Sequence, residues 1–214
     1  MQEITWHPTY TQPLRSQLQT TLELWHSEVT RILPSFPGTL KIEFDNDFLI
    51  PGYNVGGAAW DEQYLKLAYD PTESTDREAQ FAELRAIYFH EGYHLARGVS
   101  FVTTPDDLPA LTNAIEEGLA TKFEVVYTGS TPGYAKYEDR GTMLDWLEEV
   151  RRLPDGFDYD WQRWKFFDSE TKRQWILYKV GMFMVDEALH NKPDLKVEHM
   201  IGISIGQIIT LTKL

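Results

Sequence analysis

The chain has 214 residues, of which 42% are hydrophobic and 14% aromatic, a composition typical of a folded globular protein. The formal net charge of −13 argues against binding to nucleic acid or to an anionic membrane surface. The sequence has no cysteine, so disulfide bonds and thiolate metal sites are excluded, and a transition metal would need histidine and carboxylate ligands.

The first third of the chain predicts one helix and a few strands. Apolar residues recur at helical spacing over residues 13–33, and Pro34 ends this segment. Residues 39–45 alternate between apolar and polar side chains, which predicts a strand, and the glycine-rich segment 51–57 predicts a turn. Residues 58–70 alternate in part and predict one further strand.

Helical patterns dominate from residue 75 onward. Thr75 and Glu78 predict a capping box for a helix that ends near Arg97, with Gly98 as its stop. Further helices are predicted over 107–127, 140–152, 170–190 (capped by Ser169) and 195–211, although the last segment also resembles a strand. Strands followed by packed helices predict an α+β fold. We expect a single domain over 1–214, with a helix and a sheet in 1–70 and a helical part in 75–214.

The residues with the clearest chemistry lie inside the predicted helix 75–97. His90 and His94 are four residues apart, so both imidazoles lie on one helix face and can reach one metal ion. Glu91 is one position on, where its carboxylate can hold a metal-bound water. Apolar neighbours surround the triplet, and buried polar groups need a partner. The alternative is a pair of surface histidines beside a solvated glutamate.

A third ligand is expected in the next predicted helix. A catalytic zinc takes three protein ligands and keeps one position open. Glu116 and Glu117 are adjacent candidates, and we choose Glu117 because Gly118 lets a neighbouring helix approach closely. The alternative interpretation of the two glutamates is an acidic helix face.

The motif His90-Glu91-x-x-His94, followed by Glu117-Gly118-Leu119-Ala120 and by Glu124, resembles the gluzincin metallopeptidases of the M1 aminopeptidase type. It is also similar to small bacterial proteins described as predicted zinc-dependent proteases. The resemblance implies a zincin-like fold, in which the edge strand of a small mixed sheet lies over the active-site helix. It implies one Zn²⁺ ion held by His90, His94 and Glu117, with Glu124 supporting a ligating histidine, unless Glu124 is a solvated helix residue.

Two further matches follow from the same resemblance. Tyr178-x-x-Gly181 is similar to the family motif whose tyrosine stabilises the oxyanion of the tetrahedral intermediate, although Tyr178 could equally be a core tyrosine. Tyr93 and Tyr137 are weaker candidates for that role, and His199 is a possible substitute donor.

The family's substrate-binding edge strand corresponds here to a segment that begins at Gly56, Gly57 and Ala58. The segment lacks the glutamate that grips the free amine of a peptide in aminopeptidases, although Asp61 is close by, and this departure puts aminopeptidase specificity in doubt.

The expected activity is zinc-dependent hydrolysis of peptide bonds with Glu91 as general base. Hydrolysis of a non-peptide amide, ester or epoxide at the same metal, or a non-catalytic metal- or peptide-binding module, is the alternative. The expected partner is a peptide or small-molecule substrate, while the oligomeric state stays open. Five aromatic residues either form a wall of a substrate pocket or pack under a loop: Tyr159, Trp161, Trp164, Phe166 and Phe167.

The N-terminus has no cationic start followed by an apolar run, so it does not resemble a signal peptide. No stretch of the sequence reaches the ~18 consecutive apolar residues of a membrane span. A cytoplasmic protein is therefore expected.

Overall fold

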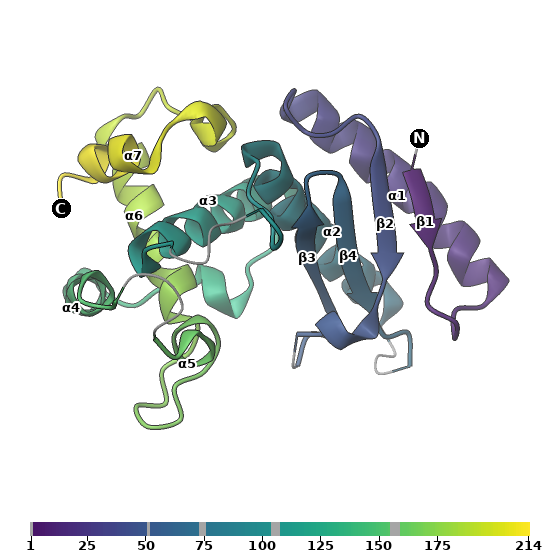
Figure 1. The fold of residues 1–214 in the computed structure, drawn as a ribbon, viewed down its shortest axis with the longest axis horizontal. Coiled ribbons are helices and arrows are strands. Elements are labelled where there is room, and N and C mark those ends of the chain that lie inside the picture. The colour runs from purple at the N-terminus through teal and green to yellow at the C-terminus, as the bar shows by residue number, and fades with distance from the viewer. Residues whose placement is uncertain (1, 51, 73–75, 104–107, 155–158) are drawn as a thin grey trace. The chain divides into compact units, whose positions relative to one another are not determined.

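The computed structural model describes residues 2–50, 52–72, 76–103, 108–154 and 159–214 (Figure 1). Its internal packing divides the chain into two compact units, residues 1–104 and 105–214. The first unit contains a four-stranded sheet and two long helices, and the second is helical, which confirms the mixed α+β class. One domain over residues 1–214 stays a prediction.

The sheet of the first unit has the strand order β1-β2-β4-β3. Strands β1 (Gln2–Thr5), β2 (Leu40–Phe44) and β4 (Tyr64–Tyr69) run parallel, whereas β3 (Val55–Asp61) pairs antiparallel with β4. The predicted strand over 39–45 is confirmed. The single strand over 58–70 is wrong, because the polar residues Glu62 and Gln63 form the turn of a β3–β4 hairpin.

Helices α1 (Gln12–Ile32) and α2 (Arg77–Arg97) lie behind the sheet in Figure 1, and α2 packs on β3 and β4. Both helices are confirmed. The carboxylate of Asp76 caps α2 by accepting a hydrogen bond from Ala79 N, and Gly98 ends it with a φ of 73°. Thr75, the predicted cap, lies outside the described residues.

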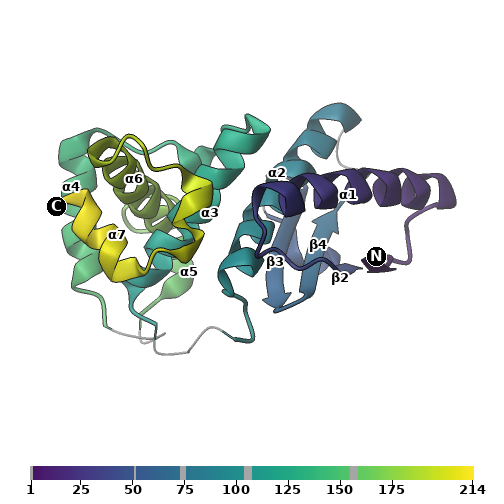
Figure 2. The same ribbon diagram turned by 90° about the horizontal axis from the view of Figure 1, so that it is seen from above.

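The second unit is built around the pair α3 (Ala110–Thr128) and α6 (Ile176–Asn191), with α4 (Arg140–Arg151), α5 (Trp161–Lys165) and α7 (Ile205–Thr212) packed against α6 (Figure 2). The α3–α6 crossing is unusually close: a Cβ atom added at Gly118 would lie 2.1 Å from the backbone carbon of Gly181. The helix that approaches Gly118 within this unit is therefore α6, the helix that carries Tyr178.

Two predicted helix boundaries in this unit are wrong. The helix expected from 170 starts at Ile176, because residues 166–175 form a hairpin in which Phe167 bridges to Gln174, so Ser169 caps no helix. The helix expected over 195–211 is split into a 3-10 segment, Val197–Gly202, and α7, since Ser204 and Gln207 form a capping box. Within the described ranges, no helix combines the length and the apolar character that a membrane crossing requires.

Candidate metal centre

His90 and His94 are brought together by one turn of helix α2. Both side chains are buried, and their Nε2 atoms lie 3.2 Å apart. Two imidazole nitrogens bound to one tetrahedral zinc ion, each at about 2.0–2.1 Å, would lie about 3.3 Å from each other. The spacing of the two rings is therefore already that of a metal-ligand pair, and the alternative of two surface histidines is wrong.

Glu117 belongs to the same potential ligand set. His90, His94 and Glu117 each offer one ligand atom, and these three atoms all lie within 4.8 Å of one another. All three residues are buried, and Glu116 is buried as well, so the glutamate pair is not an exposed acidic helix face. This group could hold a metal ion. Two nitrogen donors and one carboxylate oxygen suit zinc, but they also suit other divalent transition metals.

Glu91 is half-buried next to the histidine pair and is anchored to the sheet. Its Oε2 atom accepts a hydrogen bond of 2.8 Å from the backbone N–H of Ala59 in strand β3. The strand comes this close because Gly57 has no side chain: an added Cβ would lie 2.7 Å from Ile87 and 3.2 Å from the Cγ atom of Glu91. Strand β3 therefore orients the carboxylate of Glu91.

Strand β3 is an edge strand of the sheet, but part of its outer edge is already paired. Phe101 N donates to Ala59 O at 2.8 Å, and Val102 N donates to Trp60 O at 3.0 Å. Packing explains why residue 56 is a glycine, since an added Cβ would lie 1.9 Å from Phe48 O. Ile50 N also donates to Val55 O at 2.9 Å. Substrate binding by Gly56, Gly57 and Ala58 stays a prediction, and it is restricted to the part of the edge between Val55 and Ala59.

Glu124 is fully buried in helix α3, so the alternative of a solvated residue is wrong. The hydroxyl of Tyr134 contacts both carboxylate oxygens of Glu124 at 3.1 Å. This contact fixes the orientation of the Glu124 carboxylate, as a group that supports a ligating histidine requires. Its support of a ligating histidine stays a prediction.

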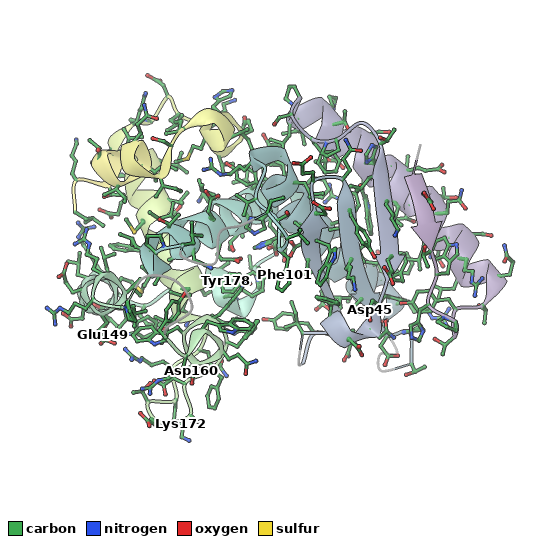
Figure 3. The ribbon with its side chains drawn as sticks, in the orientation of Figure 1. Asp45, Phe101, Glu149, Asp160, Lys172 and Tyr178 are labelled. Carbon is green, nitrogen blue, oxygen red and sulfur yellow. The ribbon has the colours of Figure 1, made fainter. Side chains whose placement is uncertain are left out.

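Tyr178 is half-buried on helix α6 within an aromatic cluster (labelled in Figure 3). Its ring centroid lies 5.2 Å from that of Tyr134 and 5.8 Å from that of Trp175. The ammonium of Lys165 lies 5.6 Å from the Tyr178 centroid and donates a 2.7 Å hydrogen bond to Glu117 Oε1. Lys165 is a site residue that the sequence reasoning missed, because no local pattern links residues 117 and 165.

The other candidates contribute less. Tyr93 is fully buried, and His199 is exposed on the 3-10 segment. The hydroxyl of Tyr137 donates to Asp186, and burial together with the nearby Asp186 carboxylate raises its pKa to about 12. Tyr137 is therefore held as a neutral donor to Asp186.

The five aromatic residues over 159–167 do not share one environment. Tyr159 is buried, Trp164 and Phe166 are half-buried, and Trp161 and Phe167 are exposed. Of these five, Phe166 and Phe167 line a hollow of about 360 Å³, and its other lining residues are polar ones between 160 and 170. Its lining includes neither Glu117 nor Lys165, so this hollow is separate from the candidate metal ligand Glu117.

Comparisons with family models, with curated proteins and with solved structures found no match for this chain, so the interpretation of the site rests on its own residues.

Proposed function

We propose that the chain is a zinc-dependent hydrolase that cleaves peptide bonds, with His90, His94 and Glu117 as metal ligands and Glu91 as general base. The observation that carries the proposal is the buried group of two imidazoles and one carboxylate with ligand atoms within 4.8 Å of one another. A structural metal site needs no general base, and the placement of Glu91 directly beside the pair favours catalysis.

Glu91 would take a proton from the attacking water and later pass it to the leaving amine. A bound zinc ion would polarise the scissile carbonyl and lower the pKa of its water toward about 7. The hydrogen bond from Ala59 N holds one carboxylate oxygen of Glu91, and the other oxygen would accept the proton of the water. A substrate strand would pair with β3 at Gly57, ahead of the stretch that Phe101 and Val102 already occupy.

The proposed fold is zincin-like. An edge strand packed on the helix that carries both histidines supports it, as does a following helix that carries Glu117. The residue pattern that resembles the gluzincins supports the same assignment. The alternatives are hydrolysis of a small non-peptide amide, ester or epoxide at the same metal, and a module that binds metal without catalysis. No contact in the described residues favours either one.

The decisive experiment combines metal analysis with a general-base variant. Protein purified without added metal is expected to contain about one zinc ion per chain, and Glu91→Gln is expected to keep that metal while kcat on a cleaved peptide falls by about 10²–10⁴-fold. Glu78→Gln, in the exposed first turn of the same helix, is the matched control and should leave kcat unchanged.

Three outcomes would contradict the proposal. If Glu91→Gln retained wild-type activity, Glu91 would not be the general base. Cleavage of small amides or esters, with no peptide in a library cleaved, would favour the second enzyme class. Metal uptake with no hydrolysis of any substrate, together with unfolding on chelation, would favour a structural site.

A further inference from the structure

Lys165 is an unexpected neighbour for a metal ligand. Its ammonium donates a 2.7 Å hydrogen bond to Glu117 Oε1, and the Lys165 and Glu117 side chains are 23% and 10% exposed. A cation beside the carboxylate competes with a metal ion for that carboxylate and repels the metal ion. A partly buried lysine at this position therefore weakens metal binding. Its presence is explained if its positive charge has a role in the hydrolysis.

The position of Lys165 is set by well-defined structure. It is the last residue of helix α5, and the hairpin that follows is closed by a 2.9 Å hydrogen bond from Trp175 N to Phe166 O. Its ammonium lies 5.6 Å from the centroid of the Tyr178 ring, at cation–π distance. The ammonium is thus held in direct hydrogen-bond contact with the candidate ligand Glu117 by the hairpin and the Tyr178 ring.

The charges of the site indicate what this ammonium does. The side chains assigned so far to the water and the metal, Glu91 and Glu117, are both carboxylates, so Lys165 is a cationic side chain that directly contacts the candidate ligand set. Hydrolysis of a peptide creates one negative charge on the former carbonyl oxygen. A fixed positive group next to that oxygen stabilises the transition state more than the neutral ground state. A tyrosine hydroxyl would supply only a neutral hydrogen bond, which is the weaker interaction.

We propose that Lys165, with the Tyr178 ring as its platform, is the protein group that stabilises the oxyanion formed during hydrolysis, and that the Tyr178 hydroxyl is not. The proposal rests on the proposed function. When water adds, a C–O bond forms, the carbonyl π pair moves onto oxygen, and Glu91 takes the proton. When the C–N bond breaks, the pair on oxygen re-forms the carbonyl, and the proton goes to the amine. Lys165 forms and breaks no covalent bond in either step.

The test compares Lys165→Met, Lys165→Arg and Tyr178→Phe in the full chain. Lys172→Met, at the exposed tip of the same hairpin (Figure 3), is the matched control. Metal-free protein is titrated with Co²⁺ and followed by visible absorption, and the Co²⁺ form is then titrated with inorganic phosphate, a tetrahedral anion. Peptide hydrolysis provides kcat and KM for each zinc-loaded variant.

We expect Lys165→Met to bind Co²⁺ within three-fold of wild type or more tightly, and to bind phosphate at least ten-fold more weakly. Its kcat should fall by about 10²–10³-fold with KM within three-fold. Lys165→Arg should recover at least one-tenth of the wild-type kcat. Tyr178→Phe should reduce kcat and phosphate affinity less than Lys165→Met does, and Lys172→Met should change neither quantity.

Two results would overturn the role of Lys165. If Lys165→Met binds Co²⁺ more than three-fold more weakly and excess metal restores kcat, the lysine only holds Glu117 in place. If Tyr178→Phe has the larger effect on kcat, the tyrosine hydroxyl is the oxyanion donor. Failure of the proposed function gives a different result: wild type that binds no metal ends both proposals. If the metal binds but no substrate is cleaved, the phosphate titration alone decides whether Lys165 completes an anion site.

Discussion

The pKa of Asp168, in the hairpin that follows Lys165, is set by a few neighbouring groups. Its side chain is buried and accepts hydrogen bonds from the Thr171 hydroxyl at 2.5 Å and from Glu170 N at 2.9 Å, with Arg163 at 3.1 Å. Burial alone would raise the pKa of Asp168, but these hydrogen bonds and the Arg163 guanidinium outweigh it and lower the pKa to about 2.

The lowered pKa predicts a specific acid sensitivity. Since the folded pKa of about 2 lies below the usual 3.8, ionised Asp168 stabilises the folded chain above about pH 4, and this contribution is lost as the pH falls through about 2. Asp168→Asn should lower the melting temperature at pH 7 by roughly 5 °C, and the difference from wild type should shrink between pH 4 and pH 2. Melting curves at several pH values measure this, with exposed Asp194→Asn as control. A constant difference across that range would contradict the prediction.

Among the site residues, the sequence predicts local relationships and misses distant ones. His90 and His94 share a helix face because they are four residues apart, whatever the rest of the fold does. The hydrogen bond between Lys165 and Glu117 spans 48 residues of sequence and depends on where α5 ends relative to α3. No periodicity or composition in either segment contains that information.

Helix packing in the second unit depends on a pair of glycines. A Cβ atom added at Gly181 would lie 1.7 Å from Ala114 O, and one added at Gly118 would lie 2.1 Å from the Gly181 carbon. Helices α3 and α6 can therefore approach backbone to backbone, which places Glu117 and Tyr178 on adjacent helices at one crossing. The sequence indicated that Gly118 permits a close approach, but the expected partner was the helix with the two histidines, whereas the atoms nearest to an added Cβ at Gly118 belong to Gly181 of α6.

Gly181→Ala is expected to force α3 and α6 apart and to destabilise the chain by about 1–3 kcal/mol or more. The same substitution at Gly206 in α7, where an added Cβ would meet nothing within 4 Å, should instead be neutral or stabilise by up to about 1 kcal/mol. Urea unfolding of both variants measures the two effects. If the two alanine variants unfold at the same urea concentration, the crossing tolerates a methyl group and this account of it is wrong.

At the level of elements, the predictions succeeded where a local signal marks a boundary. Gly98 ends α2 with a φ of 73°, as the sequence led us to expect, and Gly129 ends α3 in the same conformation. They failed where a turn is made of ordinary polar residues. Glu62 and Gln63 carry no turn signature, and Trp175, which precedes α6 with a φ of 60°, belongs to a residue type that seldom adopts this conformation.

For the whole molecule, the order of a sheet-containing part followed by a helical part could be predicted from the change in periodicity near residue 75. The division into two compact units could not, because it reflects the density of contacts and no change of composition accompanies it. The parallel strand β1 was also missed, since four residues are too few to show a period.

Metal binding predicts how the stability of the whole chain responds to zinc. A ligand that binds only the folded state stabilises it by RT ln(1 + [L]/Kd), about 4 kcal/mol at a thousand-fold excess over Kd. For a chain of this length, that energy raises the melting temperature by on the order of 10 °C. We expect a chelator to lower the melting temperature by this amount and stoichiometric zinc to restore it, whereas magnesium should not, because it prefers oxygen ligands. His94→Asn should abolish the response, and exposed His199→Asn should preserve it. A wild-type chain whose melting temperature is the same with chelator and with zinc would show that the buried His90–His94–Glu117 group does not bind the ion, and would remove the basis for hydrolysis at this site.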